Sequence, residues 1–576
     1  MSSSNPTIYE FDEFRLDADR RVLTREGEPL ALTPRVFDTL LYLVQHANRV
    51  ILKDELMRAI WADSFVEENN LSQNVSTLRR ALGNRRYILT VPGSGYRFAT
   101  EVKTISVPEK PVPVAIKSRT IAVLPFKPIV EQNRDEALEL GMADTLIARL
   151  SSSGTLIVRP LSSVRRYTGL EQDPQAAGRD LGVESVLDGS LQRSVDRIRL
   201  TVRLINVADG VSIWVGKFDE KATDVFAVQD AISERVAAAL EVPLSTEERQ
   251  HLTKRYTDNL EAYDLYLKGR YFWNKLIPRE VRRSIQFFQQ AIDLDPTYAL
   301  AYAGIAEAYR SLPISGDVPP GDAFPLAHAA AAKALEIDER LADVHATLSI
   351  LNSWYDWDWA SAEREAKRAI DLNPNSSEAH RANALLLSTL GLQKEAIAAA
   401  ARARELDPLA LLTRTHESLF LYYDGQNEEA REKLLKTLEI DPNFWIALLT
   451  LGKICVSEGR FDDAIDVLTK ARSYSGGNKQ TVSWIGYACA LAGDHAQART
   501  VLEKLKAVFR QSFVPPYNIA LIHNGLADDE ETFSWLERAY EMRDVLLSAF
   551  VTVDPVWNRL RGTERFKRIL KGMNLE

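Results

Sequence analysis

The chain has 576 residues, and its 45% apolar and 26% charged composition is that of a folded protein too long for one compact core. Its formal net charge of −9 excludes a general polycation, so any nucleic-acid site must be local. Two cysteines, Cys455 and Cys489, exclude a disulfide scaffold and a cysteine-rich zinc site, and they fit a reducing cytosol.

Targeting signals are not visible in the sequence. Residues 1–9 lack a basic segment followed by an apolar stretch, and no run of about 18 apolar residues occurs. We therefore expect a cytoplasmic protein with no membrane contact.

The first region, residues 7–100, mixes short strand-like and helical patterns. An apolar-periodic helix is predicted over residues 34–46 with Thr33 as its N-cap, and a second helix over 53–61. A third helix is predicted over 69–82. Its buried stripe consists of Leu71, Val75, Leu78 and Leu82.

A separate, uncharged face of the third helix has the chemistry needed to read DNA bases. Asparagine and glutamine can pair bidentately with adenine, and threonine can contact a thymine methyl group. The candidate base-contacting residues are Asn70, Gln73, Asn74 and Thr77.

Charge in this region is strongly polarised. Residues 69–100 hold five arginines and no acidic residue, whereas residues 1–68 hold eight basic and thirteen acidic residues. One basic face is sufficient for phosphate contact. The arginines are Arg79, Arg80, Arg85, Arg86 and Arg97.

Two short strands are predicted after the third helix, over residues 87–91 and 96–99. Pro92, Gly93, Ser94 and Gly95 form the tight turn between them. This pattern predicts a β-hairpin wing whose tip could reach a minor groove.

These blocks resemble a known family. LTPRVFDTLLYLVQHANRVILKDELMRAIW, VEENNLSQNVSTLRRALGN and ILTVPGSGYRF, in this order within residues 7–100, resemble the OmpR/PhoB-type winged helix-turn-helix domain of CadC/ToxR-like regulators. The resemblance implies that the third helix enters the major groove and the hairpin the minor groove of double-stranded DNA. It makes Arg79, Arg80, Ser94 and Arg97 candidate backbone or wing contacts, and the loop 62–68 a candidate contact for RNA polymerase.

A linker and an α/β domain are predicted next. Residues 101–118 contain three prolines among valine and lysine, which is typical of an extended linker. Strands are predicted over 120–126, 156–159, 197–207 and 211–218, with an Asp209-Gly210 turn before the last, and helices over 136–150, 174–181 and 225–240. This domain, residues 119–245, resembles the TolB-like N-terminal domain, a family that implies no settled chemistry.

The rest of the chain has a fixed period. Pro374, Pro408 and Pro442 are 34 residues apart and each follows an amphipathic helix, while small residues recur between them. Pro296 precedes Pro374 by two periods plus ten residues, and most of the excess lies in the insertion 311–322. The pattern resembles the tetratricopeptide repeat and implies roughly eight repeats over 260–546, followed by a capping segment, 547–576. Its concave face is the predicted contact surface for a protein or peptide ligand.

No catalytic motif is present. The sequence has no P-loop, dinucleotide fingerprint, HExxH or GxSxG motif, so we expect no enzyme, no metal site and no cofactor. The predicted fold is therefore multidomain and mainly α: a winged helix, a central α/β domain and a C-terminal α-solenoid. The predicted function is a one-component transcription regulator, and the alternative is a scaffold protein that does not bind DNA.

Overall fold

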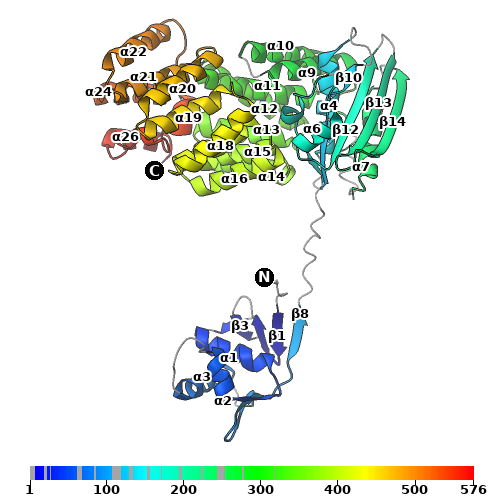
Figure 1. The fold of residues 1–576 in the computed structure, drawn as a ribbon, viewed down its shortest axis with the longest axis vertical. Coiled ribbons are helices and arrows are strands. Elements are labelled where there is room, and N and C mark those ends of the chain that lie inside the picture. The colour runs from blue at the N-terminus through cyan, green and yellow to red at the C-terminus, as the bar shows by residue number, and fades with distance from the viewer. Residues whose placement is uncertain are drawn as a thin grey trace. The chain divides into compact units, whose positions relative to one another are not determined.

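A computed structural model describes the chain as two compact units, Met1–Lys117 and Ser118–Glu576 (Figure 1). The described residues are 7–17, 22–25, 28–30, 32–60, 68–83, 86–106, 119–128, 134–151, 156–169, 171–193, 197–221, 225–242, 252, 254–275, 278–316 and 318–575.

The first unit is a winged helix with two antiparallel sheets. One sheet has the order β4-β3-β2-β1-β8, and the other has the order β5-β7-β6. Its strands are β1 (Thr7–Phe11), β2 (Phe14–Asp17), β3 (Val22–Arg25), β4 (Glu28–Leu30), β5 (Val50–Leu52), β6 (Ile88–Val91), β7 (Gly95–Phe98) and β8 (Lys103–Ser106). Its helices are α1 (Pro34–Gln45), α2 (Lys53–Ile60) and α3 (Glu68–Ala81).

The predicted helices and hairpin of this unit are confirmed, with two corrections. Thr33 occupies the N-cap position of α1, but its side chain makes no capping hydrogen bond. Strand β8 lies inside the predicted linker and pairs with β1, so the domain extends past residue 100 to Ser106. The pairing satisfies the edge of the first sheet, a constraint that local proline content does not reveal.

The second unit begins with an α/β domain. Strands β11, β9 and β12 are parallel, and β12, β13 and β14 follow as an antiparallel meander, with β10 pairing beside β12. The strands are β9 (Arg119–Val123), β10 (Lys127–Pro128), β11 (Leu156–Val158), β12 (Ser185–Arg193), β13 (Arg197–Asn206) and β14 (Ser212–Lys221). The helices are α4 (Glu136–Leu150), α5 (Leu161–Val164), α6 (Pro174–Asp180) and α7 (Val225–Ala239).

The described residues from Leu260 to Glu541 form eight antiparallel helix pairs, in agreement with the predicted repeat number (Figure 1). The first helices of the pairs are α9 (Leu260–Trp273), α11 (Ala299–Ser311), α13 (Ala342–Leu351), α15 (Ser377–Thr389), α17 (Leu411–Tyr423), α19 (Trp445–Ser457), α21 (Lys479–Leu491) and α23 (Pro516–Gly525). The second helices are α10 (Pro278–Leu294), α12 (Pro320–Ile337), α14 (Trp359–Leu372), α16 (Gln393–Leu406), α18 (Asn427–Ile440), α20 (Phe461–Tyr474), α22 (His495–Phe509) and α24 (Asp529–Glu541). Short helices η3 (Pro313–Ser315) and η4 (Asn352–Asp356) interrupt the period, and α25 (Val545–Phe550), η5 (Pro555–Trp557) and α26 (Glu564–Gly572) end the chain.

Small residues let neighbouring helices approach closely, as the period predicts. A Cβ atom built on Gly452 would lie 2.6 Å from the Leu468 side chain, so a larger residue here would force Leu468 of α20 to shift. Cys455 of α19 and Cys489 of α21 are buried at the same position of their repeats, and burial raises the pKa of both thiols.

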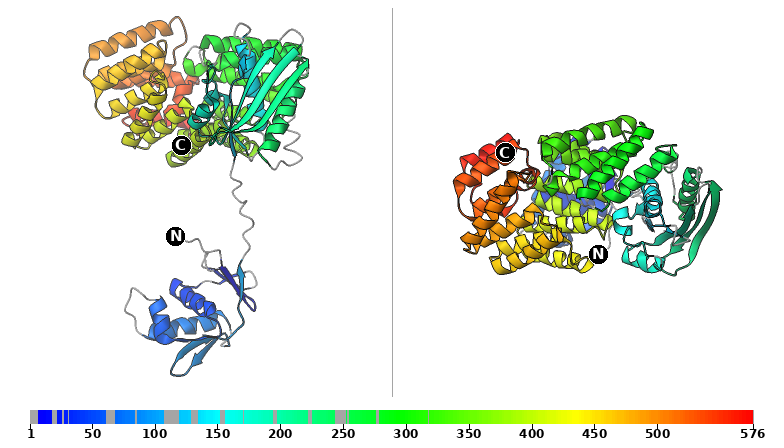
Figure 2. Two further views of the ribbon diagram at one scale, coloured as in Figure 1. Left: turned by 45° about the vertical axis from the view of Figure 1, so that its right-hand side comes forward. Right: turned by 90° about the horizontal axis from the view of Figure 1, so that it is seen from above.

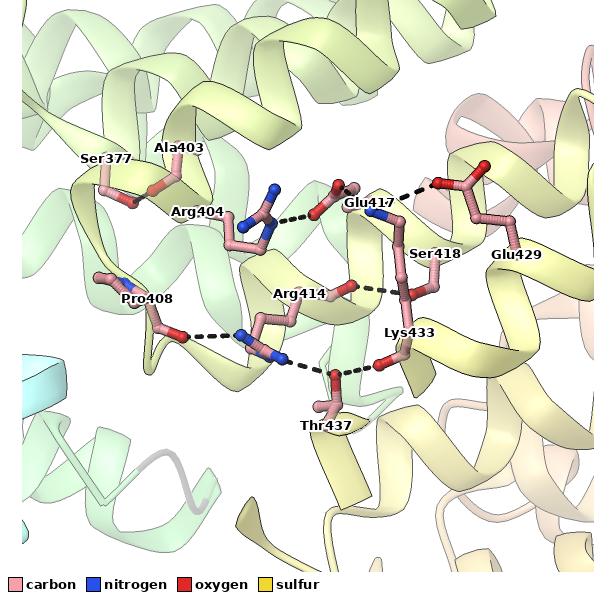
Figure 3. A network of polar contacts seen from close by, with 10 residues as sticks. All are labelled: Ser377, Ala403, Arg404, Pro408, Arg414, Glu417, Ser418, Glu429, Lys433 and Thr437. Atoms are coloured by element: carbon pink, nitrogen blue, oxygen red, sulfur yellow. Dashed lines mark hydrogen bonds and ion pairs between the residues drawn. The ribbon is translucent and has the colours of Figure 1, made fainter. Parts of the chain in front are cut away.

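Polar contacts connect successive repeats (Figure 3). Glu417 of α17 is almost fully buried and accepts hydrogen bonds from Arg404 of α16 at 2.6 Å and from Lys433 of α18 at 2.9 Å. Arg414 donates to the Pro408 carbonyl at 3.0 Å. Because one buried carboxylate is shared by two cations from flanking helices, the relative position of three helices is fixed.

The α/β domain is docked on the repeat array. Helix α4 packs against α9, where a Cβ atom on Gly141 would lie 2.5 Å from Leu267. Arg159 donates to the carbonyl oxygens of Glu405 and Leu406 at 2.9 and 2.6 Å. Ser162 donates to Asp407 at 2.7 Å, and Ser163 donates to the same carboxylate. The two predicted domains therefore form one compact unit.

The C-terminal segment, residues 543–575, closes the repeat array on itself. Successive first helices contact one another, as in the pairs α13–α15 and α21–α23, so they line the inner side of the curve. The segment contacts these helices and distant parts of the array. Thr552 donates to the Thr389 carbonyl at 2.7 Å, Trp357 to Ser548 at 2.8 Å, and Asn524 to the Val556 carbonyl at 2.7 Å.

The centre of this closure is a buried ion pair. The Lys453 ammonium lies 3.2 Å from the Asp554 carboxylate, with side-chain exposures of 4% and 0%. The ring centroids of Trp484 and Phe550 lie 4.7 and 4.8 Å from the same ammonium. Part of the concave face predicted as a contact surface is therefore occupied by the C-terminal segment.

Candidate nucleic-acid interface

Helix α3 is held by the apolar stripe that its sequence predicts. Leu71, Val75, Leu78 and Leu82 are all at most 1% exposed and belong to the core of the first unit. Burial of these four side chains fixes the rotation of α3, and the opposite side of the helix faces away from the core.

One row of side chains follows the exposed side of α3. Asn70, Gln73, Thr77 and Arg80 are exposed and follow one another at i, i+3, i+7 and i+10, the spacing of a single helix face. The Thr77 hydroxyl donates to the Gln73 carbonyl at 2.9 Å, so this hydroxyl is satisfied within the helix. The row ends in an arginine and contains no acid, which suits base edges flanked by phosphate.

Asn74 does not share this exposed row, which corrects the predicted uniform polar face. It is half-buried, and its amide donates to the Arg35 carbonyl at 3.3 Å and to the Thr39 hydroxyl at 3.1 Å, both on α1. A helical wheel separates Asn74 from the apolar stripe, but it does not show that α1 passes beside this position.

Arg79 also faces the body of the domain. Its guanidinium donates to the Ile88 carbonyl at 3.0 and 2.7 Å and to the Thr90 hydroxyl at 2.8 Å. These contacts attach the C-terminal end of α3 to strand β6 of the wing. In the free domain Arg79 thus positions the helix and the hairpin relative to each other.

The wing is a tight hairpin in which glycine is required. A Cβ atom at Gly95 would lie 2.0 Å from the Ile51 carbonyl oxygen, because β7 passes directly against β5. Gly93 has φ of +71°, a conformation that suits glycine. Ser94, predicted as a wing contact, lies half-buried in this turn, and its amide donates to the Val91 carbonyl at 3.0 Å.

Arg97 lies on the outer face of the three-stranded sheet. It pairs across the sheet with Val50 on one side and Leu89 on the other, and both of these residues are about one-third exposed. Its Nε is enclosed without a hydrogen-bond partner among the described residues.

The loop 62–68 and Arg85 lie largely or wholly outside the described residues, so the predicted polymerase contact stays a prediction.

No described helix is both long and apolar enough to cross a membrane.

Family comparisons agree with this architecture. Residues 27–98 match "Transcriptional regulatory protein, C terminal", residues 117–235 match "HilA/YgeH-like transcriptional regulator, second domain", and residues 421–478 match "Tetratricopeptide repeat". The middle match does not confirm the TolB-like resemblance, which stays a prediction.

Three relatives illustrate how far the similarity extends. The transcriptional regulator HilA of Salmonella typhi is 23% identical over 86% of this chain and 82% of its own length. The transcriptional activator CadC of Escherichia coli is 35% identical over 14% of this chain and 17% of its own length. A putative adenylate cyclase 3 of Rhizobium meliloti is 30% identical, but the match covers only 42% of either chain. The chain thus combines the DNA-binding domain of transcription regulators with a repeat region of the kind used for protein interaction.

Proposed function

We propose that this protein recognises its DNA site through the exposed row of α3, namely Asn70, Gln73, Thr77 and Arg80. Gln73 and Asn70 provide amides for base edges, the Thr77 methyl group provides an apolar contact, and Arg80 provides a phosphate contact. The observation that carries this assignment is that these four residues lie exposed along one helix face, while Asn74 and Arg79 are held by the domain itself.

Asn74 and Arg79 act indirectly in this proposal. Asn74 fixes α3 against α1, and Arg79 fixes α3 against the wing. Both set the geometry in which the exposed row and the hairpin reach two adjacent grooves. Their loss therefore lowers affinity for every sequence, whereas loss of Gln73 changes which sequence is preferred.

The second unit is proposed to receive the regulatory signal without catalysis. Because the C-terminal segment fills part of the inner surface of the repeats, a protein ligand binds the outer surface or the remaining inner surface near the α/β domain. The protein acts in the cytoplasm, where bacterial DNA is found, and contact with RNA polymerase through residues 62–68 belongs to the same proposal.

Binding to a selected DNA site tests the assignment. A preferred site is first selected from random duplexes with the full-length protein, and affinities are then measured for that site and for a scrambled duplex at several salt concentrations. Gln73→Ala is expected to reduce the ratio of specific to scrambled affinity. Arg80→Ala is expected to weaken both alike and to lower the salt slope by about one.

A matched control removes an exposed arginine elsewhere on the domain. Arg15 of β2 is exposed and lies 3.9 Å from Glu10, so Arg15→Ala alters charge without touching α3 or the wing. Equal effects of Arg15→Ala and Arg80→Ala would refute the interface, and an unchanged affinity ratio in Gln73→Ala would refute the base-reading role.

A further inference from the structure

Strand β14 forms an open edge of the sheet in the second unit (Figure 2). It pairs with β13 along one side, from Arg197 opposite Lys221 to Ile205 opposite Ser212, and no described strand pairs with its other side. In an edge strand of this kind, every second residue directs its N–H and C=O groups outward, where another strand can accept them.

The two halves of this edge differ in chemistry. Val211, directly before β14, and Ile213 and Val215 within it are 60%, 42% and 50% exposed, and no charged residue lies between Asp209 and Lys217. The second half, from Lys217 to Lys221, is rich in charge. Charged side chains normally protect an edge strand from pairing, so the first half is the unprotected part.

A β-bulge shapes this first half. Leu204 of β13 lies opposite Trp214, and the next residue, Ile205, lies opposite Ser212. Ile213 is therefore the additional residue of β14. Both Ser212 and Ile213 are exposed. A bulge can protect an edge by twisting it, but here it presents an apolar side chain to solvent instead of a charged one.

We propose that the first half of β14 pairs antiparallel with the same segment of a second copy of this chain. A two-fold axis at Ile213 places Ile213 opposite its own counterpart and Val211 opposite Val215 of the second copy. The same register brings Lys217 of the second copy beside the hairpin turn that holds Asp209, whose carboxylate accepts the Val211 amide at 2.9 Å. The edge is therefore self-complementary in its apolar side chains, with opposite charges near each end, whereas an axis at Lys217 would bring two ammonium groups together.

Self-association through β14 does not depend on the DNA-contact assignment. Where both hold, one dimer carries two winged helices, and the second binding event on a pair of half-sites becomes intramolecular. Failure of DNA binding with an intact dimer would reject the interface on α3, and loss of the dimer alone would reject the pairing of β14.

Cysteine cross-linking of the full-length protein tests the axis directly. Paired residues in antiparallel strands lie about 4.5–5.5 Å apart at Cα, which is within the range of a disulfide. Ile213→Cys is expected to form a disulfide-linked dimer under mild oxidation, whereas Lys221→Cys, outside the paired half, is expected to stay monomeric on a non-reducing gel. The native Cys455 and Cys489 are buried, and the unmodified chain shows how much cross-linking these two cysteines give by themselves.

Sedimentation analysis provides the second readout. The unmodified protein is expected to dimerise, and Val215→Lys and Lys217→Asp are each expected to raise the dimer dissociation constant at least about tenfold. Lys221→Asp, with an equal charge change outside the paired half, is expected to leave it unchanged. A monomeric unmodified protein, or a dimer that all three variants leave intact, would overturn the proposal, and circular dichroism of each variant establishes that the sheet is folded.

Discussion

Breaking the buried ion pair that holds the C-terminal segment should have unequal effects from its two sides. Lys453→Met leaves the Asp554 carboxylate, which is 0% exposed, with the Val556 amide at 3.3 Å and the electrostatic attraction of Arg561, which donates to the Asp554 carbonyl at 2.9 Å. Loss of one partner of a buried pair costs about 3–5 kcal/mol, because the other charge stays desolvated. We expect Lys453→Met to lie within this range.

Asp554→Asn should cost less. The Lys453 ammonium keeps the rings of Trp484 and Phe550 at 4.7 and 4.8 Å, and cation–π attraction of about 0.5–2 kcal/mol offsets part of the loss. We therefore expect a loss of about 2–3 kcal/mol. The double variant should lose clearly less than the sum of the single losses, since neither charge then remains unpaired.

Urea unfolding of the full-length protein, followed by tryptophan fluorescence and circular dichroism, measures these differences. Nine of the ten tryptophans lie in the second unit, so fluorescence reports mainly on the repeats and the α/β domain. Arg402→Met is the control, because Arg402 and Glu405 form an exposed pair worth less than about 1 kcal/mol. A larger loss in Asp554→Asn than in Lys453→Met, or additive losses in the double variant, would refute the closure by this pair.

Three further outcomes follow from the structure. Asn74→Ala should destabilise the first unit by about 1–2 kcal/mol in thermal unfolding, because its hydrogen bonds to α1 are lost. In titrations it should weaken binding to specific and scrambled DNA alike. A selective loss on the specific site would make Asn74 a base contact instead. Gly95→Ala should unfold the wing, seen as lost amide protection in β7, because its Cβ atom would lie 2.0 Å from the Ile51 carbonyl; native protection would contradict the close approach. Burial raises the pKa of Asp544 to about 7. The folded state then keeps a proton that the unfolded state releases near pH 4, so the stability of the second unit should fall as pH rises from about 4 to 7, and Asp544→Asn should flatten this slope.

Local patterns predicted the elements whose burial follows a simple period. The helix over 136–150 agrees with α4 at both ends, and the apolar stripe of α3 is buried at all four positions. The central strand β12 was not predicted because Asp188 interrupts its apolar run. In the structure that carboxylate is buried beside Arg203 at 2.7 Å and Lys127 at 3.8 Å, and these partners come from other parts of the chain.

For the candidate DNA contacts too, local patterns do not predict which side chains are held by distant parts of the domain. Periodicity separates the polar face of α3 from its core, and it identified Asn70, Gln73 and Thr77 as outward-facing positions, whereas Arg80 was a candidate through the family resemblance. It assigned Asn74 to the same face because the crossing of α1 is a tertiary feature with no local signal. Polar residues at the margin of a recognition helix can therefore serve either the DNA or the domain, and only the neighbouring helix decides between the two.

The closed interior of the repeats is the feature least accessible to sequence. A period of 34 residues predicts how each helix pair stacks on the next, but it contains no information about contacts between Thr389 and Thr552 or between Lys453 and Asp554, which lie 163 and 101 residues apart. The closure also changes what the array can do. An open solenoid offers its whole concave face to a ligand. In this protein, aromatic and charged residues of that face contact the C-terminal segment instead. Under the proposed function, a regulatory partner therefore binds a surface that the closure leaves exposed, and the edge at β14 is one such surface.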